Sequence, residues 1–378
     1  MRILLAGGGT GGHINPAVAI AGELAKIYPG AEFLFAAVPG NMEDTMIPKQ
    51  GYPVAHIHVA GFYRSFLPWD IAHNIKAAVW LAGSGHRAEQ IIKEFHPDFA
   101  IGTGGYVSGP IIRKAEQMGI PVFLHEQNAY PGMTTKMLAP RAETVFLAFE
   151  EARARIPDAK RFEVVGNPVR HSFIGIDKQQ ARAKLGLDDH FTIVSVGGSL
   201  GATAINRMAA DLMAWHAEKG EINHIHGFGK NGRERFPKML KERGLDLSKY
   251  PRIHAMEFID QMHLYLAAAD LVISRAGAIT ISELETVGAP SILVPYPYAA
   301  ENHQYHNGMV LQNAGAALVI EEKDYKRDWL IGEVEKFVAS PQRVRSFSEN
   351  ARRLAVTDTC SRIGASIQAT LAEKGITG

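Results

Sequence analysis

Cysteine is almost absent from this chain of 378 residues. The single cysteine, Cys360, excludes a disulfide within the chain and a zinc site built from cysteines. Long apolar runs are lacking as well. No stretch approaches the roughly 20 residues of a membrane-spanning helix, and the first apolar run, residues 3–6, is far too short for a signal peptide. The sequence therefore predicts a cytoplasmic protein.

An excess of charge of either sign is also lacking. The 40 basic and 39 acidic residues leave a formal net charge of +1, and neither zinc-finger spacing nor an aromatic and basic RNA-recognition pattern occurs. We therefore expect no nucleic-acid partner. The content of 46% hydrophobic and 21% charged residues is ordinary for a folded protein. Because the chain is too long for one comfortable core, we expect two domains.

The same local pattern opens each half of the chain. A strand, a glycine-rich turn and a helix follow one another, at residues 2–6, 7–12 and 14–27 and again at 191–196, 197–201 and 203–217. This alternation predicts an α/β fold of two doubly wound, Rossmann-like domains whose glycine loops face one cleft. We place the domains at residues 1–168 and 169–345. Helices in 346–378 are expected to pack back toward the first domain.

Residues 270–304 read as a strand, a glycine turn, a helix and a second strand. The helix is expected to begin at Thr280, at the carboxyl end of the first strand, where backbone N–H groups and the helix dipole favour an anion. Glu283 and Gln304 add polar groups suited to hydroxyls. A sugar nucleotide would use both features. An ordinary crossover with a surface glutamate is the alternative.

The first glycine loop, GGGTGGH, places Gly7, Gly9 and Gly12 in the G-x-G-x-x-G spacing of dinucleotide sites. No strand that ends in an acidic residue follows about 20 positions later, which argues against a nicotinamide or flavin enzyme. His13 comes directly after the loop, at the start of a helix. A histidine there is suited to orient or deprotonate a ligand, and a capping or packing role is the alternative.

Four polar residues, HEQN, follow the expected strand at 122–124. The carboxyl end of a strand in an open α/β sheet is where a crevice site forms. Glu126 is suited to act as an acid or base, and Asn128 to bind sugar hydroxyls. The alternative is that these residues cap the next segment.

Residues 62–81, FYRSFLPWDIAHNIKAAVWL, combine aromatic residues with an apolar stripe. Ile71, Ile75 and Val79 form this stripe. It lies on a different face from the apolar stripe of the helix that follows. Together with the basic residues Arg64 and Lys76, the stripe indicates a shallow membrane-contact surface. The alternative is that the preceding loop folds back over the stripe.

Several segments, taken together, resemble the MurG family: GGGTGGHINP, GTGGYVSGP, HEQNAYPG, VGNPVR, GGSLGA, SRAGAITISE and the segment around Gln304. They come in the family's order from Gly7 to Asn307 and so span nearly the whole chain. The family is the bacterial N-acetylglucosaminyltransferase that converts lipid I to lipid II. The resemblance implies the GT-B architecture, with a first domain that faces the acceptor and the membrane and a second that holds the donor.

The resemblance implies UDP-N-acetylglucosamine as the donor. Ile259 would pair with the uracil, Glu283 with the ribose hydroxyls and Ser199 with the α-phosphate. The other implied donor contacts are Thr10, Gly11, Gly12, Asn128, Arg170, Ala278, Ile279, Thr280, Ile281, Ser282 and Gln304. Gly104 and Gly105 would meet the acceptor's diphosphate.

The implied reaction is attack of the muramyl 4-hydroxyl on the anomeric carbon, with loss of UDP, inversion of configuration and an oxocarbenium-like transition state. We assign the base to His13 first, with Glu126 as rival or helper. The leaving group would be stabilised by Ser199, Arg170 and the helix N-terminus near Ala278. Because the chain contains no Asp-x-Asp motif, we expect neither a metal nor another cofactor.

The long polyprenyl tail of the acceptor implies work at a membrane surface. The resemblance thus favours a peripheral protein on the cytoplasmic face of the cell membrane. The expected contact residues are Phe66, Trp69, Ile75, Lys76, Val79 and Trp80. Residues 82–85 depart from the family, because they are small and glycine-rich where its hydrophobic patch carries larger side chains.

The expected partners are UDP-N-acetylglucosamine, polyprenyl-linked lipid I and the membrane surface, with cell-wall synthesis proteins as further candidates. Three other functions remain open. They are a glucosyltransferase acting on diacylglycerol, a hydrolysing epimerase of the same fold, and a scaffold that binds the nucleotide sugar without turning it over.

Overall fold

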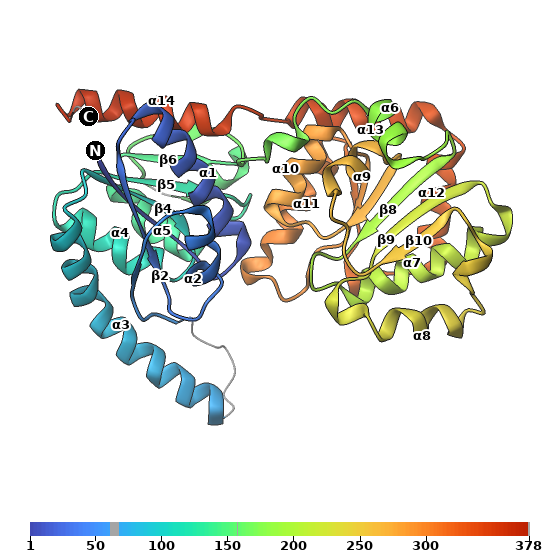
Figure 1. Ribbon diagram of the computed structural model, residues 1–378, viewed down its shortest axis with the longest axis horizontal. Coiled ribbons are helices and arrows are strands. Elements are labelled where there is room, and N and C mark those ends of the chain that lie inside the picture. The colour runs from blue at the N-terminus through green and yellow to red at the C-terminus, as the bar shows by residue number, and fades with distance from the viewer. Residues whose placement is uncertain (61–67, 157, 377–378) are drawn as a thin grey trace. The chain divides into compact units, whose positions relative to one another are not determined.

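The computed structural model describes residues 1–60, 68–156 and 158–376, and of residues 68, 70–79, 81 and 82 the backbone alone. The chain divides into two compact units, Met1–Pro168 with Asp358–Gly378, and Val169–Thr357 (Figure 1). Residues 346–378, expected as one group, are split between them. Helix α13 (Pro341–Leu354) belongs to the second unit, whereas α14 (Thr359–Glu373) belongs to the first.

The first unit is built on a parallel sheet in the order β3-β2-β1-β4-β5-β6-β7. Its strands are β1 (Arg2–Gly7), β2 (Glu32–Ala37), β3 (Val54–His56), β4 (Phe99–Gly104), β5 (Val122–Glu126), β6 (Thr144–Leu147) and β7 (Phe162–Val164). Its helices are α1 (Gly11–Ile27), α2 (Glu43–Met46), α3 (Pro68–Phe95), α4 (Ser108–Gln117), α5 (Met133–Leu138) and α14, with 3-10 turns η1 (Pro48–Gln50), η2 (Ala139–Arg141) and η3 (Glu150–Arg155).

Alternating apolar residues of β1 feed two cores, one on each face of this sheet. Ile3 and Leu5 pack with α1 and α14, whereas Leu4 and Ala6 pack with α3 and α4. The side-chain period of two in a strand explains this division, and a strand buried on both faces must be apolar throughout. The N-terminal end of α14 is held by the hydroxyl of Thr359, which donates to the backbone carbonyl of Val165 at 2.7 Å.

The second unit repeats the plan, with a parallel sheet in the order β10-β9-β8-β11-β12-β13. Its strands are β8 (Phe191–Val196), β9 (Ile222–Gly227), β10 (Ile253–Met256), β11 (Leu271–Ser274), β12 (Ser291–Leu293) and β13 (Ala317–Val319). Its helices are α6 (Lys178–Leu185), α7 (Thr203–His216), α8 (Arg235–Glu242), α9 (Met262–Ala268), α10 (Ala278–Val287), α11 (His303–Asn313), α12 (Arg327–Val338) and α13. Its 3-10 turns are η4 (His171–Phe173), η5 (Ala217–Lys219), η6 (Lys230–Gly232), η7 (Leu247–Lys249), η8 (Ala300–Asn302) and η9 (Glu322–Asp324).

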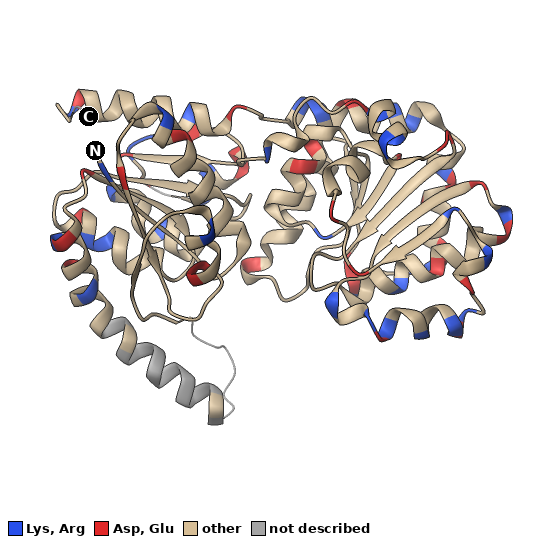
Figure 2. Ribbon diagram, viewed as in Figure 1, with Lys and Arg blue, Asp and Glu red and all other residues tan. Residues whose placement is uncertain are grey.

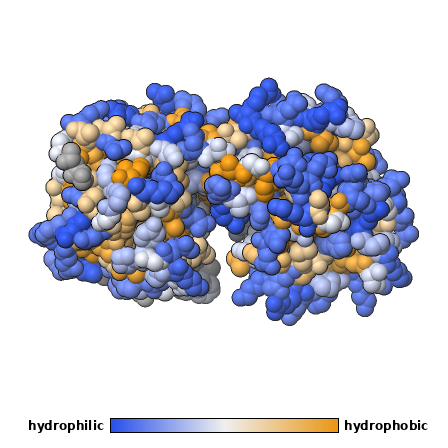
Figure 3. Space-filling model, turned by 45° about the horizontal axis from the view of Figure 1, so that its top comes forward, coloured by the Kyte–Doolittle hydropathy of each residue, from blue (hydrophilic) through white to orange (hydrophobic). Residues whose placement is uncertain are grey.

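Charged and hydrophobic residues are distributed as expected for two α/β domains that each have a buried core. The strands of the second sheet contain no charged residue, and Lys, Arg, Asp and Glu lie on helices and loops in mixed order (Figure 2). The face drawn in Figure 3 carries separate hydrophobic patches among hydrophilic residues. In the second unit, a hydrophobic core forms where α7 and α12 pack on apolar residues of β8, β11 and β12.

Two helices begin earlier than the sequence predicts. The helix expected at residues 14–27 begins at Gly11, after an extended Thr10, and the helix expected at 280–287 begins at Ala278, after an extended Gly277. The first turn of a helix tolerates glycine and small residues because its N–H groups need no intrahelical partner. As a result, His13 lies within the first turn of α1.

Candidate active site

Both sheets reverse their strand order at one point. The reversal lies between β1 and β4 in the first unit, and between β8 and β11 in the second. In open parallel sheets, ligands bind at the carboxyl ends of the strands beside such a switch point. The glycine loops singled out from the sequence follow β1, β4 and β8, and the anion-binding turn follows β11. The three glycine loops and the turn before α10 therefore lie at the switch point of their own unit.

His13 is held at the first switch point by two contacts, and its ring lies where position 104 has no side chain. Its backbone carbonyl accepts the hydroxyl hydrogen of Thr103 at 2.8 Å, and its Nδ1 lies 2.9 Å from Oε1 of Gln127. Gly104 has φ of +100°, and a Cβ there would lie 2.8 Å from His13 Nδ1. Only glycine fits both the backbone conformation and the close ring. The imidazole is half-exposed and fixed in orientation.

A buried carboxylate that has no motif around it in the sequence holds the first glycine loop. Glu43 has no exposed surface, and its Oε2 accepts the N–H of Gly9 at 2.9 Å while Oε1 accepts that of Val38 at 3.4 Å. A Cβ on Gly8 would lie 2.7 Å from this carboxyl group. Because Glu43 takes up the Gly9 N–H, the donors left for an anion are those of the first turn of α1.

Both carboxylate oxygens of Glu126, the alternative base, accept hydrogen bonds. Its Oε1 accepts the backbone N–H and the side-chain amide of Asn128, both at 3.1 Å. Its Oε2 accepts the N–H of Gly132 at 3.0 Å and the hydroxyl of Thr135 at 2.6 Å. The carboxylate is 3% exposed, and these four donors use its accepting directions. The geometry thus gives Glu126 the task of shaping the turn that presents Asn128.

Gly104 and Gly105 bring the two glycine loops of the first unit together. The N–H of Gly104 donates to the hydroxyl of Ser108 at 3.2 Å, and its carbonyl accepts the N–H of Gly8 at 3.3 Å. A Cβ on Gly105 would lie 2.2 Å from the carbonyl oxygen of Gly8. Close backbone approach therefore requires glycine at position 105, whereas at position 104 the positive φ and the nearby His13 ring require it.

In the second unit, α10 begins at the carboxyl end of β11. Its N-cap, Gly277, has no side chain that could cap the helix, and its first turn contains no acidic residue. This leaves a helix N-terminus with positive potential. Arg275 holds the preceding loop, because its guanidinium donates to the carbonyls of Val294 and Pro295 at 3.0 and 3.1 Å and pairs with Glu322 at 2.5 Å.

Glu283, on α10, is a nearly buried carboxylate with one charged partner. It is 8% exposed, and its Oε1 accepts a hydrogen bond from Nη2 of Arg170 at 3.0 Å. Burial raises the pKa of Glu283, and the nearby Arg170 guanidinium opposes that rise. The guanidinium itself stays mostly in solvent. Such a carboxylate retains accepting capacity for ligand hydroxyls.

The other expected donor residues of the second unit differ in what they can offer. Ser199 is exposed, and its backbone carbonyl accepts the N–H of Lys230 at 3.2 Å. Ile259 is 2% exposed, so only its backbone is suited to recognise a base. Gln304 turns its Oε1 to the N–H of Tyr296 at 3.0 Å and thereby braces the loop after β12. Of the α10 residues, Ala278, Ile281 and Ser282 are buried, whereas Ile279 and Thr280 are half-buried.

The expected membrane residues fall on or before α3. Phe66 lies outside the described residues, as do the side chains of Ile75, Lys76 and Val79. Trp69 is 67% exposed, whereas the ring of Trp80 packs with that of His58 at a centroid distance of 5.5 Å. Across residues 1–60, 68–156 and 158–376, none of the helices is both long enough and apolar enough to span a bilayer.

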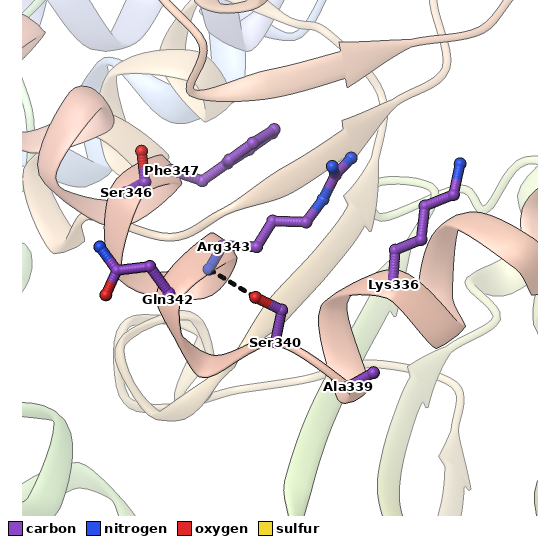
Figure 4. A pocket seen from close by; sticks show the side chains of 7 residues that line it. All are labelled: Lys336, Ala339, Ser340, Gln342, Arg343, Ser346 and Phe347. Atoms are coloured by element: carbon purple, nitrogen blue, oxygen red, sulfur yellow. Dashed lines mark hydrogen bonds between the residues drawn. The ribbon is translucent and has the colours of Figure 1, made fainter.

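A hollow lies away from all expected site residues, where α12 meets α13. It is lined by Lys336, Ala339, Ser340, Gln342, Arg343, Ser346 and Phe347 (Figure 4). The Ser340 hydroxyl there accepts the N–H of Arg343 at 3.2 Å, which is an ordinary helix cap. In the described part of the chain, no three His, Cys, Asp or Glu side chains form a cluster that could hold a metal ion.

Comparison with known proteins adds relatives to this geometry. The glycosyltransferase family 28 N-terminal domain matches residues 3–147, and the C-terminal domain of that family matches residues 192–363. A protein of Desulforamulus reducens is 36% identical over 96% of this chain and 97% of its own. One of Caldanaerobacter subterraneus subsp. tengcongensis is 38% identical over 96% and 98%. Both are named UDP-N-acetylglucosamine–N-acetylmuramyl-(pentapeptide) pyrophosphoryl-undecaprenol N-acetylglucosamine transferase.

Solved structures show the same architecture. The crystal structure of Acinetobacter baumannii MurG superposes with a TM-score of 0.77 at 28% identity, covering 97% of this chain and 99% of that one. A UDP-GlcNAc 2-epimerase from Neisseria meningitidis shares the fold alone, with a TM-score of 0.64, 14% identity and 97% and 99% of the two chains covered. The fold is therefore GT-B. The chain is a glycosyltransferase, and it belongs to the MurG family of N-acetylglucosamine transferases within glycosyltransferase family 28.

Proposed function

We propose that this enzyme transfers N-acetylglucosamine from UDP-N-acetylglucosamine to the muramyl 4-hydroxyl of polyprenyl-linked lipid I, and so forms lipid II. The likeness over nearly the full length to relatives named for this transfer carries the proposal. A half-exposed histidine at the β1–β4 switch point supports it, because acceptor activation needs a base there. The first unit takes the acceptor, and the second takes the donor.

The donor assignment is supported by the polar groups around α10. The buried carboxylate of Glu283 accepts the ribose hydroxyls, and the backbone of Ile259 pairs with the uracil. The uncapped N-terminus of α10, together with Ser199 and Arg170, meets the diphosphate. Gln304, which braces the loop after β12, lies on the sugar. This set supplies phosphate donors and hydroxyl acceptors on one unit.

The reaction proceeds with inversion. The acceptor O–H gives its proton to Nε2 of His13 while its oxygen bonds to the anomeric carbon. The bond from that carbon to the UDP oxygen breaks, and its electron pair leaves with the diphosphate. Glu126 holds the turn that carries Asn128, since its oxygens already accept four hydrogen bonds.

Stabilisation of the departing UDP falls to fixed donors rather than a metal. The N-terminus of α10 and the Arg170 guanidinium carry positive charge, and Ser199 adds a hydroxyl and its loop's N–H groups. The lack of an Asp-x-Asp motif in the sequence supports this route. We accordingly assign metal-independent transfer.

The membrane assignment concerns α3 and the segment before it. Trp69, exposed near the start of this helix, supports contact with lipid, and the enzyme is peripheral on the cytoplasmic face of the membrane. Trp69→Glu combined with Ile75→Glu is expected to abolish co-sedimentation with anionic vesicles. The control, Met118→Glu, places the same charge at an exposed methionine of the same unit. Unchanged sedimentation of the double variant would remove the assignment.

UDP release from UDP-N-acetylglucosamine tests the whole proposal, measured with and without a lipid I analogue and in the presence of EDTA. Release that requires the acceptor and persists in the chelator is the expected result. Release without an acceptor would instead indicate a hydrolysing epimerase. Donor binding without any release would indicate a scaffold. Transfer from UDP-glucose to a diacylglycerol acceptor, measured beside transfer from UDP-N-acetylglucosamine to the lipid I analogue, tests the remaining alternative, a diacylglycerol glucosyltransferase.

A further inference from the structure

A chain of buried polar groups runs behind His13. Oε1 of Gln127 lies 2.9 Å from Nδ1 of His13, and Nε2 of Gln127 lies 2.9 Å from Nδ1 of His125. Nε2 of His125 in turn lies 3.0 Å from the backbone carbonyl of Gly166. Gln127 is 2% exposed and His125 is 1% exposed. These buried groups cannot exchange their partners for water, so the direction of each hydrogen bond matters.

The direction follows from the carbonyl of Gly166. A carbonyl oxygen only accepts, so Nε2 of His125 carries a hydrogen. Burial, the largest effect, lowers the pKa of His125, while its hydrogen bond to Gly166 opposes that shift. The ring is therefore neutral. A neutral imidazole with hydrogen on Nε2 has a lone pair on Nδ1, so the Gln127 amide donates to it.

A second contact fixes the same orientation of the Gln127 amide. The atom that faces Nδ1 of His125 also lies 2.8 Å from the backbone carbonyl of His125. Two acceptors at one end of the amide require the NH2 group there, which resolves the usual ambiguity between amide oxygen and nitrogen. The other end, Oε1, is an acceptor. Nδ1 of His13 must therefore donate its hydrogen to Gln127.

We propose that Gln127, oriented by His125, is a positioning residue that holds His13 in the tautomer with hydrogen on Nδ1 and the lone pair on Nε2. The inference deepens the proposed function and rests on His13 as the base. In the described part of the chain, no hydrogen bond reaches Nε2 of His13, which is half-exposed. That nitrogen is the one left for the acceptor hydroxyl.

The arrangement also suits the imidazolium form of His13 that exists after proton transfer. When Nε2 receives the acceptor's proton, the imidazolium keeps its Nδ1–H bond to Oε1 of Gln127, and no ring rotation is needed. A glutamine orients the ring without the negative charge that a carboxylate would place beside it. Gly104 leaves room for the ring in this position, since a Cβ there would meet Nδ1 and Cε1 at 2.8 and 2.9 Å.

The first test needs no substitution. Long-range nitrogen–proton NMR correlation on histidine-labelled enzyme, assigned with His13→Ala, reports which ring nitrogen of His13 carries the hydrogen. We expect the Nδ1–H form near neutral pH. The Nε2–H form in the unsubstituted enzyme would overturn the inference. Gln127→Met keeps the side-chain length without hydrogen bonding and is expected to yield a mixture of both tautomers.

The second test is kinetic. Gln127→Met is expected to lower kcat by about 10- to 100-fold with the KM for UDP-N-acetylglucosamine unchanged, because positioned general bases typically contribute 10²–10⁴-fold. Gln127→Glu is expected to move the acidic limb of the pH–rate profile to higher pH, because a carboxylate favours the imidazolium. Gln117→Met, at an exposed glutamine of the same unit, is the control and is expected to change neither quantity.

The outcomes separate the inference from the function on which it rests. Wild-type kcat and pH profile in both Gln127 variants, with loss of activity in His13→Ala, would overturn the positioning role alone. Full activity in His13→Ala would overturn the base assignment and, with it, the catalytic meaning of the tautomer. Lowered kcat in Gln127→Met and the shifted limb in Gln127→Glu would support both.

Discussion

Acidification from about pH 7.5 to about pH 5.5 is expected to destabilise the second unit, because buried histidines lie side by side within it. Nε2 of His216, on α7, is 3.0 Å from Nδ1 of His224, on β9. The hydroxyl of Ser195 lies 2.9 Å from Nε2 of His224 and 2.8 Å from Nδ1 of His226. Burial lowers the pKa of His216 to about 4, that of His226 to about 3 and that of His224 well below its ordinary value.

The magnitude follows from the unfolded state. An unfolded histidine has a pKa of about 6.5, so at about pH 5.5 it is roughly ten-to-one protonated, whereas these three stay neutral in the fold. The unfolded chain then binds more protons, and the free energy of unfolding falls as the pH falls below about 6.5. Each histidine contributes about 1.4 kcal/mol at about pH 5.5, or about 4 kcal/mol together. This is a large part of the 5–15 kcal/mol that typically stabilises a domain.

Amide hydrogen exchange of β8 and β9 measures this loss in the second unit alone. After correction for intrinsic rates, protection at about pH 5.5 is expected to be about 4 kcal/mol lower than at about pH 7.5. His216→Gln removes one titrating group, so its difference is expected to shrink by about 1.4 kcal/mol. His254→Gln, at an exposed histidine of β10, is the control. Equal protection at the two pH values would refute the reasoning.

Three further changes test the active site. Glu283→Gln is expected to weaken donor binding about 10-fold in calorimetry, because a buried accepting carboxylate is lost; unchanged affinity would exclude it from the donor site. Gly104→Ala is expected to lower kcat about 10- to 100-fold by displacing His13. Gly119→Ala has a similar positive φ but open space, so it controls for backbone strain, and equal losses in both would contradict the displacement. Glu126→Gln is expected to lower stability by about 2 kcal/mol in thermal unfolding, since its carboxylate holds four donors. Loss of activity at full stability would instead favour a role as base.

The glycine loops could be read from the sequence because their signal is local. A strand, a glycine run and a helix all lie within residues 2–27, and sheet topology then brings such loops to one edge. The site that His13 occupies was accessible in the same way, since it directly follows the first loop. This pattern predicts the two doubly wound α/β domains, whereas the GT-B architecture and the glycosyltransferase function are predicted from the resemblance to the MurG family. All of these predictions are confirmed.

The supporting residues could not be read in the same way. Glu43 follows β2 and reaches the N–H of Gly9 only because the fold places these segments side by side. Gln127 looks like its neighbour Glu126 in sequence, yet the first points to His13 and the second to the turn after β5. Successive side chains at the end of a strand point to opposite faces, and this alternation, rather than the residue type, gives the two neighbours different roles. The short edge strand β3 carries too few residues to show any period.

Helix α14 makes the second unit an insertion within the first. The chain leaves the first unit after Pro168 and returns at Asp358, and Ile363, Ile367 and Leu371 then complete the core beside α1. During synthesis on the ribosome, every residue of the second unit emerges before the last piece of the first unit exists. A nascent first unit therefore exposes the apolar surface beside α1 until α14 has emerged and packed against it.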